Sequence, residues 1–102
     1  MKALELTQRI KSNSAPQVMD ARSGLEFKRG HIPGAIHAPV WKILLKRARL
    51  PENKNSELVI TCEHGPRALM AKCLLAAYGY RNTTLLDGHM LGWRRSGLPL
   101  EK

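Results

Sequence analysis

The segment ELVIT, residues 57–61, constrains the fold more than any other part of the chain because it is apolar almost throughout. A strand with two apolar faces must be covered on both sides of its sheet, which is typical of parallel sheets. Strand candidates alternate with helix candidates around it, and this order favours short crossovers between parallel strands. The sequence therefore predicts an α/β fold with a small parallel sheet of about five strands and helices on both faces. We expect residues 1–102 to form a single domain, since this length suffices for one hydrophobic core.

The other elements are predicted from apolar spacing, helix caps and chain breakers. Strands are expected at 17–21, 35–37 and 82–86, in addition to 57–61. Helices are expected at 3–12, 23–30, 40–51, from about 66 to 78, and at 88–97.

Two of these helices carry distinctive faces. In helix 40–51, cations occupy the face opposite the apolar one, namely Lys42, Lys46 and Arg49. Helix 66–78 has almost no polar side, so we expect it to be covered all round, with Cys73 as a packed small hydrophobe. Trp41 and Trp93 fall at apolar helical spacing and are expected to close the core.

The formal net charge of +9 favours anionic partners, such as a small oxyanion, an acidic protein, nucleic acid or a membrane surface. Aromatic residues make up only 5% of the chain, which disfavours stacking platforms for bases and hence a nucleic-acid partner. No apolar run approaches the roughly 20 residues that span a bilayer, and no signal peptide is apparent. Two cysteines are too few for a disulfide scaffold. We therefore expect a cytoplasmic protein without a membrane partner.

The stretch ITCEHGPRA, residues 60–68, places Cys62 at the carboxyl end of the buried strand, where sites form in open parallel sheets. Gly65 allows a tight turn, and Pro66 can open a helix at its first position. The amides of the loop and the first helical turn lack intrahelical partners and can stabilise an anion together with Arg67. Such surroundings favour a reactive thiolate. The alternative is that Cys62 merely ends a buried strand, since free cysteines are often core residues.

Two signatures make the chain resemble a single-domain rhodanese, a sulfurtransferase family. The first is VMDARSGLEFKRGHIPGAIHAP, residues 18–39; the second is VITCEHGPRA at 59–68, followed by GYRNTTLLDGHMLGW at 79–93. In the first signature the following residues match the family's pattern: Asp20, Arg22, Glu26, Gly30, His31, Ile32, Pro33, Gly34 and Ala35.

The resemblance implies that Cys62 is the catalytic nucleophile and carries sulfur as a persulfide, without a metal or an organic cofactor. A donor such as thiosulfate or a persulfide would load it, and cyanide or a thiol would remove the sulfur. The implied sulfur-binding residues form the rest of the loop: Glu63, His64, Gly65, Pro66, Arg67 and Ala68. The spacing Cys-x4-Arg is one residue shorter than the Cys-x5-Arg loop of cysteine-based phosphatases, and a tighter ring of amides fits a single sulfur better than a phosphate.

Three residues outside the loop are expected to support it structurally. Asp20 and Arg22 are read as an ion pair or a loop anchor, with Glu26 as an alternative partner of Arg22. His31 is expected to stiffen its turn by a hydrogen bond to the backbone.

Three further side chains bear on the loop's charge. Glu63 adds a negative charge that opposes thiolate formation and repels thiosulfate. His64 is read either as a source of positive charge or a proton shuttle, or as a solvated side chain. His89 stands where the family commonly has a glycine, and we favour a surface position at a helix start over one facing the substrate entrance.

Three functions follow from these features. The first is a sulfurtransferase that takes a small sulfur-containing anion or a thiol. The second is a protein sulfur carrier whose basic surface docks an acidic sulfur-acceptor protein. The third, ranked below the others, is a basic nucleic-acid-binding module.

Overall fold

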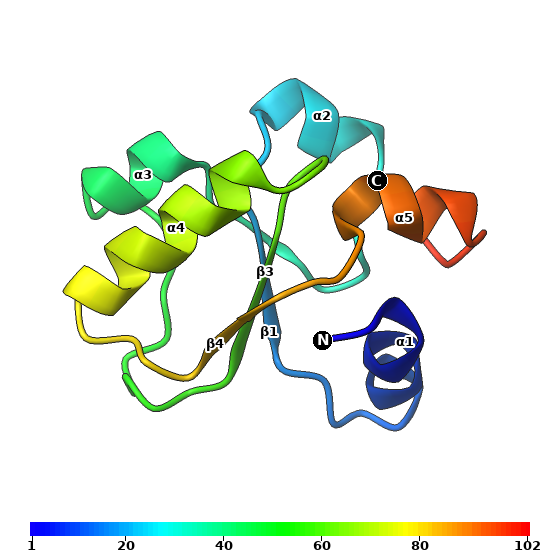
Figure 1. Ribbon diagram of the computed structural model, residues 1–102, viewed down its shortest axis with the longest axis horizontal. Helices are drawn as coiled ribbons and strands as arrows, with labels where there is room; N and C mark the ends of the chain where they lie inside the picture. Colours follow the sequence, from blue (N-terminus) through cyan, green and yellow to red (C-terminus); the bar gives the residue numbers. More distant parts are fainter.

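The computed structural model describes residues 1–102 and contains one parallel sheet with helices on both faces (Figure 1). Its strands are β1 (Gln17–Asp20), β2 (Ile36–His37), β3 (Leu58–Thr61) and β4 (Thr83–Leu85). All neighbouring strands are parallel, and their order is β2-β1-β3-β4. The α/β class and the buried central strand are as predicted, but the sheet has four strands rather than about five.

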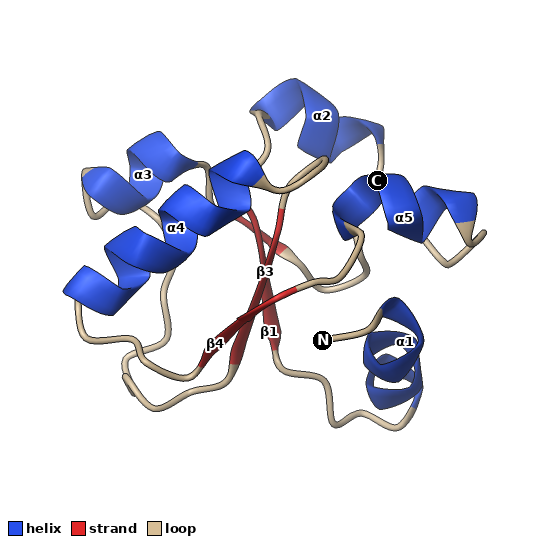
Figure 2. Cartoon of the chain, in the orientation of Figure 1, coloured by secondary structure: helices blue, strands red, loops and turns tan.

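The helices are α1 (Ala3–Lys11), α2 (Gly24–Arg29), α3 (Val40–Leu44), α4 (Pro66–Ala77) and α5 (His89–Arg95). Helices α3 and α4 lie on one side of the sheet, and α1 and α5 lie on the other (Figure 2). None of the five is long and apolar enough to cross a membrane. The loop from β3 to α4 lies at the same end of the sheet as α2 (Figure 1).

Strand β3 is buried on both faces, as its sequence predicts. Leu58 and Ile60 pack into the core that α3 and α4 cover, whereas Val59 packs with Leu6 of α1 and Trp93 of α5. Successive side chains of a strand point to opposite faces, so one short apolar strand contributes to both cores. Because β3 is buried on both faces, it lies in the middle of the molecule. This also fixes the position of Cys62, which follows directly after it.

Helix α3 is shorter than the sequence predicts, because it ends at Leu44 instead of continuing to residue 51. Lys46 adopts a left-handed conformation with φ 58°, and its amide donates to the Ile43 carbonyl at 3.0 Å. The amide of Arg47 reaches back to the Lys42 carbonyl at 2.7 Å, which completes a Schellman motif. The expected cationic helix face therefore does not form, since only Lys42 of the three predicted cations lies on the helix.

The outer side of α4 is exposed, contrary to the expectation that it is covered all round. Leu69 is 53% exposed, Met70 is 58% exposed, and Cys73 is exposed rather than packed. Because α3 has only five residues, it covers α4 incompletely. Between the two helices lies a hollow of about 490 Å³, here called the apolar groove, lined by Val40, Leu44, Leu69, Met70, Cys73 and Leu74.

The two tryptophans differ in environment. Trp93 is fully buried and donates its indole N–H to the Pro99 carbonyl at 2.8 Å, as expected for a core residue. Trp41 is 53% exposed, so the expectation that it closes the core is wrong. The early end of α3 leaves its side chain in solvent, where Lys42 Nζ lies 5.6 Å from the ring centroid.

Candidate active site

The candidate site is the loop between β3 and α4, which begins with Cys62 directly after the buried strand. Gly65 is the N-cap of α4 and has φ 133°, a conformation that side-chain-bearing residues rarely adopt. Pro66 follows at the first helical position, where its missing N–H costs nothing. The local sequence thus makes the turn tight and aims the start of α4 at the cysteine.

The amides of the loop are the main electrostatic feature around Cys62 Sγ. The Gly65 N–H donates to Sγ over 3.0 Å. The N–H groups of Glu63, His64, Arg67 and Ala68 donate to no acceptor within the protein. Unsatisfied amides at the start of a 12-residue helix form the positive end of its dipole and favour a bound anion. One polarised amide contacts the sulfur, and four more remain available around the loop.

The side chain of Cys62 is fully buried and belongs to the core that α3 and α4 cover. Its carbonyl accepts from the Met90 amide at 3.0 Å, and the Glu63 carbonyl accepts from Leu91 at 3.1 Å, so α5 holds the start of the loop. The two cysteines are free, with Cys73 on the exposed side of α4. Cys62 therefore has both the burial expected of a core cysteine and the amide hydrogen bond expected beside an anionic sulfur.

Arg67 is held by Glu26 of α2. The two side chains form hydrogen bonds of 2.6 and 3.1 Å, although they are 41 residues apart in sequence. The hydrogen bond from Arg67 and, secondarily, bonds from the Ser23 capping box lower the pKa of Glu26 to about 2. In return Glu26 raises the pKa of Arg67, to which the nearby Cys62 also contributes. Glu26 thus pairs with Arg67, not with Arg22.

This pair gives a pH-dependent contribution to stability. The pKa of Glu26 in the folded chain, about 2, lies below its ordinary value of 4.5, so the stabilisation is complete above pH 4.5 and is lost as the pH falls towards 2. Both side chains are about one-third exposed, so solvent screening limits the effect to about 1 kcal/mol. We expect Glu26→Gln to lower the unfolding free energy at neutral pH, with the deficit shrinking in acid. Urea unfolding at several pH values measures this, and a deficit that stays constant with pH contradicts it.

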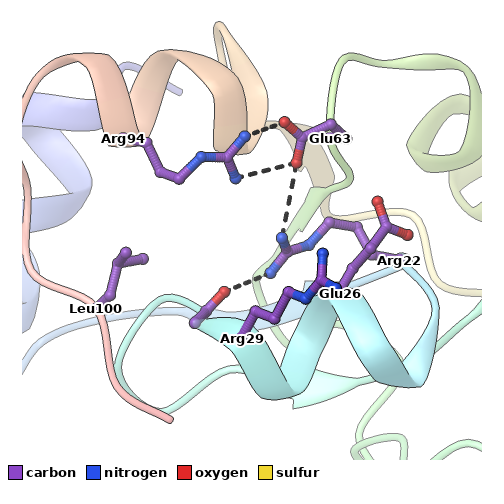
Figure 3. A pocket seen from close by; sticks show the side chains of 7 residues that line it. Arg22, Glu26, Arg29, Glu63, Arg94 and Leu100 are labelled. Atoms are coloured by element: carbon purple, nitrogen blue, oxygen red, sulfur yellow. Dashed lines mark hydrogen bonds and ion pairs between the residues drawn. The ribbon is translucent and has the colours of Figure 1, made fainter.

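Glu63, whose charge is expected to oppose the thiolate, forms ion pairs with two arginines. Its carboxylate forms a bidentate ion pair with Arg94 of α5 and lies 3.7 Å from Arg22 (Figure 3). The hydrogen bonds from Arg94 lower the pKa of Glu63. The three side chains border a pocket of about 390 Å³, whose lining is Arg22, Glu26, Arg29, Gly30, Glu63, Arg94 and Leu100.

Asp20 and Arg22 form a buried ion pair beneath this pocket. Arg22 Nη2 lies 2.9 Å from Asp20 Oδ2, and Arg22 Nε lies 3.0 Å from Oδ1, while the exposed fractions of the two side chains are 3% and 0%. Arg22 also donates to the Gly30 carbonyl at 2.7 Å. His31 Nδ1 lies 2.9 Å from the Phe27 carbonyl, and its ring stacks on that of Phe27. These contacts join the end of β1 to both ends of α2.

His89 lies against the loop, which corrects its expected position on the surface. Its Nδ1 accepts the Cys62 N–H at 3.3 Å, although the two residues are 27 apart in sequence. His64 is exposed and makes no hydrogen bond within the protein, so its side chain is the solvated one. The sequence signal for His89 was its departure from the family's glycine.

The structure therefore brings Cys62, Glu63, Gly65 and Arg67 together in one loop, and each charged member has a counter-ion from another helix. Pro66 is exposed at the start of α4, and Ala68 is buried beneath it. The arrangement holds one sulfur against polarised amides in a charge-balanced frame. It suits a nucleophile whose negative charge persists through a reaction cycle.

Comparisons with known proteins agree with this geometry. The rhodanese-like domain family matches residues 2–96. A sulfurtransferase of Allochromatium vinosum is 32% identical over 93% of this chain and 87% of its own length. YrkF of Bacillus subtilis, provisionally named a sulfur carrier protein, is 28% identical over 84% of this chain, which spans only 45% of YrkF. The human single-domain sulfurtransferase TSTD1 superposes with a TM-score of 0.78 at 28% identity, covering 93% of this chain and 94% of that one. The chain belongs to the rhodanese-like domain family.

Proposed function

We propose that this chain acts as a single rhodanese domain that transfers a sulfane sulfur from an anionic or thiol-based donor to a nucleophilic acceptor through a persulfide on Cys62. The contact that carries the proposal is the 3.0 Å hydrogen bond from the Gly65 amide to Cys62 Sγ. The names of two relatives, a sulfurtransferase and a single-domain sulfurtransferase, support the reaction class. We assign the reaction to a reducing compartment such as the cytoplasm, where the thiol stays free.

The reaction has two displacement steps. The Cys62 thiolate attacks the outer sulfur of the donor, the new S–S bond forms, and the donor's S–S bond breaks. The departing group keeps the electron pair, as sulfite from thiosulfate or as a thiolate from an organic persulfide. Cyanide or an acceptor thiolate then attacks the outer sulfur of Cys62 and restores its thiolate. The sulfur on the loop is negative before and after loading, so the same amides serve both states.

The burial of Cys62 adds a condition to this scheme. Because the residue has no exposed surface, a donor reaches Sγ only when the loop over it moves. The ion pairs of Arg67 with Glu26 and of Glu63 with Arg94 tie the loop to α2 and α5. We propose that these ion pairs return the loop to the same conformation after each transfer.

Intact mass spectrometry tests the proposal directly. The chain is incubated with thiosulfate, or with an organic persulfide, and the mass is recorded before and after adding cyanide. We expect a gain of one sulfur that cyanide removes. An unchanged mass with both donors contradicts the proposal.

A second candidate function is that of a sulfur carrier that delivers to an acidic protein. The apolar groove begins one helical turn into α4, near the loop, and its walls carry exposed leucines. No acidic residue occurs between Glu26 and Glu52 or between Glu63 and Asp87, the two stretches that contain α3 and α4. A second copy of this chain would bring like charges together, so charge complementarity favours an acidic partner with an apolar helix face. The provisional name of YrkF supports this candidate.

Charge reversal separates the two functions. We expect the triple variant Lys42→Glu, Lys46→Glu and Arg49→Glu to slow sulfur transfer to an acidic acceptor protein by about tenfold or more, because steering and docking both weaken. Its rate with thiosulfate and cyanide should change by less than about twofold, since the three side chains line pockets that contain no residue of the Cys62 loop. Equal losses with protein and small-molecule acceptors contradict the docking role. The control is the double reversal Lys2→Glu with Lys11→Glu at the two ends of α1, which lies across the sheet from the groove.

A further inference from the structure

His89 connects the backbone of Cys62 with the rim of the loop. It is the first residue of α5, and its Nδ1 lies 3.3 Å from the Cys62 N and 3.5 Å from Thr61 Oγ1. A backbone N–H can only donate, so Nδ1 must carry a lone pair. The proton of the neutral ring is therefore on Nε2.

The Nε2 atom is available to a ligand. It makes no hydrogen bond within the protein, and no buried side-chain nitrogen lacks a partner, so Nε2 is in contact with solvent. It lies 3.5 Å from the position that a Cβ on Gly65 would occupy. Gly65 is the residue whose amide contacts Cys62 Sγ. An Nε2–H donor therefore sits beside the amide that holds the sulfur.

The surroundings of the His89 ring favour its neutral form. Burial lowers the pKa of His89, the charge of His64 lowers it further, and Asp87 opposes both. Two titratable groups act on the ring, His64 in the loop and Asp87 before α5. The neutral ring agrees with the lone pair that the Cys62 amide requires.

The backbone of His89 adopts a conformation that histidine takes less readily than glycine or asparagine. Its φ of 50° is left-handed, a region that glycine and asparagine occupy more readily than histidine. Strained residues of this kind persist where the surrounding contacts hold them, and they cluster at functional sites. At this position the contacts are those of the imidazole with β3 and the loop.

We propose that His89 is a catalytic residue for sulfur transfer: its Nδ1 fixes the Cys62 backbone, and its Nε2–H donates a hydrogen bond to the group that leaves the donor sulfur. This role rests on the proposed persulfide reaction. As the Cys62–sulfur bond forms and the donor's S–S bond breaks, negative charge grows on the departing sulfite or thiolate. A hydrogen bond to that charge stabilises the transition state more than the ground state, and no proton needs to be transferred.

Two variants separate the nitrogens of the ring. Asparagine carries Oδ1 at the place of Nδ1, so His89→Asn keeps an acceptor for the Cys62 amide but lacks the Nε2–H donor. His89→Gly removes both. Both residues suit φ 50°, so both variants should fold, and thermal unfolding checks this. Arg95→Gln, at the exposed end of the same helix, is the control.

The rate of sulfur loading from thiosulfate is measured by intact mass at saturating donor and neutral pH. We expect a loss of about tenfold for His89→Asn and about a hundredfold for His89→Gly, with less than about twofold for Arg95→Gln. The loss should appear in the maximal rate and not in the half-saturating concentration. His89→Gly loading as fast as the wild type overturns the proposal.

NMR spectroscopy tests the tautomer of His89 independently of the sulfur-transfer reaction. Long-range ¹H–¹⁵N spectra of the wild-type chain should show His89 as the neutral Nε2–H tautomer at neutral pH. An Nδ1–H tautomer or an imidazolium overturns the proposal even if sulfur loads normally. If the wild-type chain takes up no sulfur while the expected tautomer is present, the proposed reaction fails and the tautomer assignment stands.

Discussion

Replacing Cys62 with serine should reduce sulfur transfer from thiosulfate to cyanide to the background rate. A serine hydroxyl is not ionised at neutral pH and cannot hold a sulfane sulfur, so both displacement steps are lost. Removing a nucleophile from a preorganised site costs at least about a thousandfold in rate. Thiocyanate production measures the loss, and intact mass shows whether any sulfur is still bound.

The second cysteine provides the matched control. Cys73 lies on the exposed side of α4, so Cys73→Ser should retain the wild-type rate with small donors and acceptors. Both variants replace one sulfur with one oxygen and remain comparable in size. If transfer survives in Cys62→Ser but disappears in Cys73→Ser, the reacting thiol is that of Cys73 and our scheme is wrong.

Replacing Arg22 with methionine should lower the unfolding free energy more than any other single substitution of a charged residue around the Cys62 loop. In this variant the Asp20 carboxylate stays fully buried. Its only remaining hydrogen bond comes from the backbone N–H at position 22. Breaking one side of a buried ion pair costs about 3–5 kcal/mol, because the remaining charge is desolvated without compensation. Urea unfolding should show the loss as a midpoint lowered by about 1–3 M.

An exposed pair serves as the comparison for this loss. Arg9 and Glu57 are linked by two hydrogen bonds of 2.9 and 2.7 Å, but their side chains are 30% and 34% exposed. Arg9→Met should lower the urea midpoint far less than Arg22→Met does, since water screens the exposed pair. The double variant Asp20→Asn with Arg22→Met should regain part of the Arg22→Met loss. Equal losses for Arg22→Met and Arg9→Met would contradict the importance of burial.

The parts of the site that were predicted from sequence are those that depend on neighbours in the chain. Cys62, Gly65 and Pro66 form their turn from local preferences, namely a strand end, a positive φ and a proline at a helix start. The packing of successive β3 side chains into opposite cores likewise follows from the two-residue period of a strand. Such features need no knowledge of what lies opposite them.

The parts that were missed depend on partners distant in sequence or on unusual backbone conformations. Glu26 and Arg67 meet across 41 residues, and His89 reaches Cys62 across 27, so neither pairing is visible in a local pattern. The end of α3 was missed because a lysine, Lys46, takes the left-handed position that glycine usually fills. One shortened helix then exposes the side of α4 that its apolar sequence suggested was covered.

The complete burial of Cys62 has a consequence for how long a loaded sulfur would survive. A persulfide on an exposed cysteine is open to any dissolved reductant, whereas one formed at Cys62 would be sheltered by the same loop that polarises it. Release would then depend on an acceptor that enters as the loop opens, so the lifetime of the stored sulfur would be set by the frequency of opening and not by the abundance of thiols in solution.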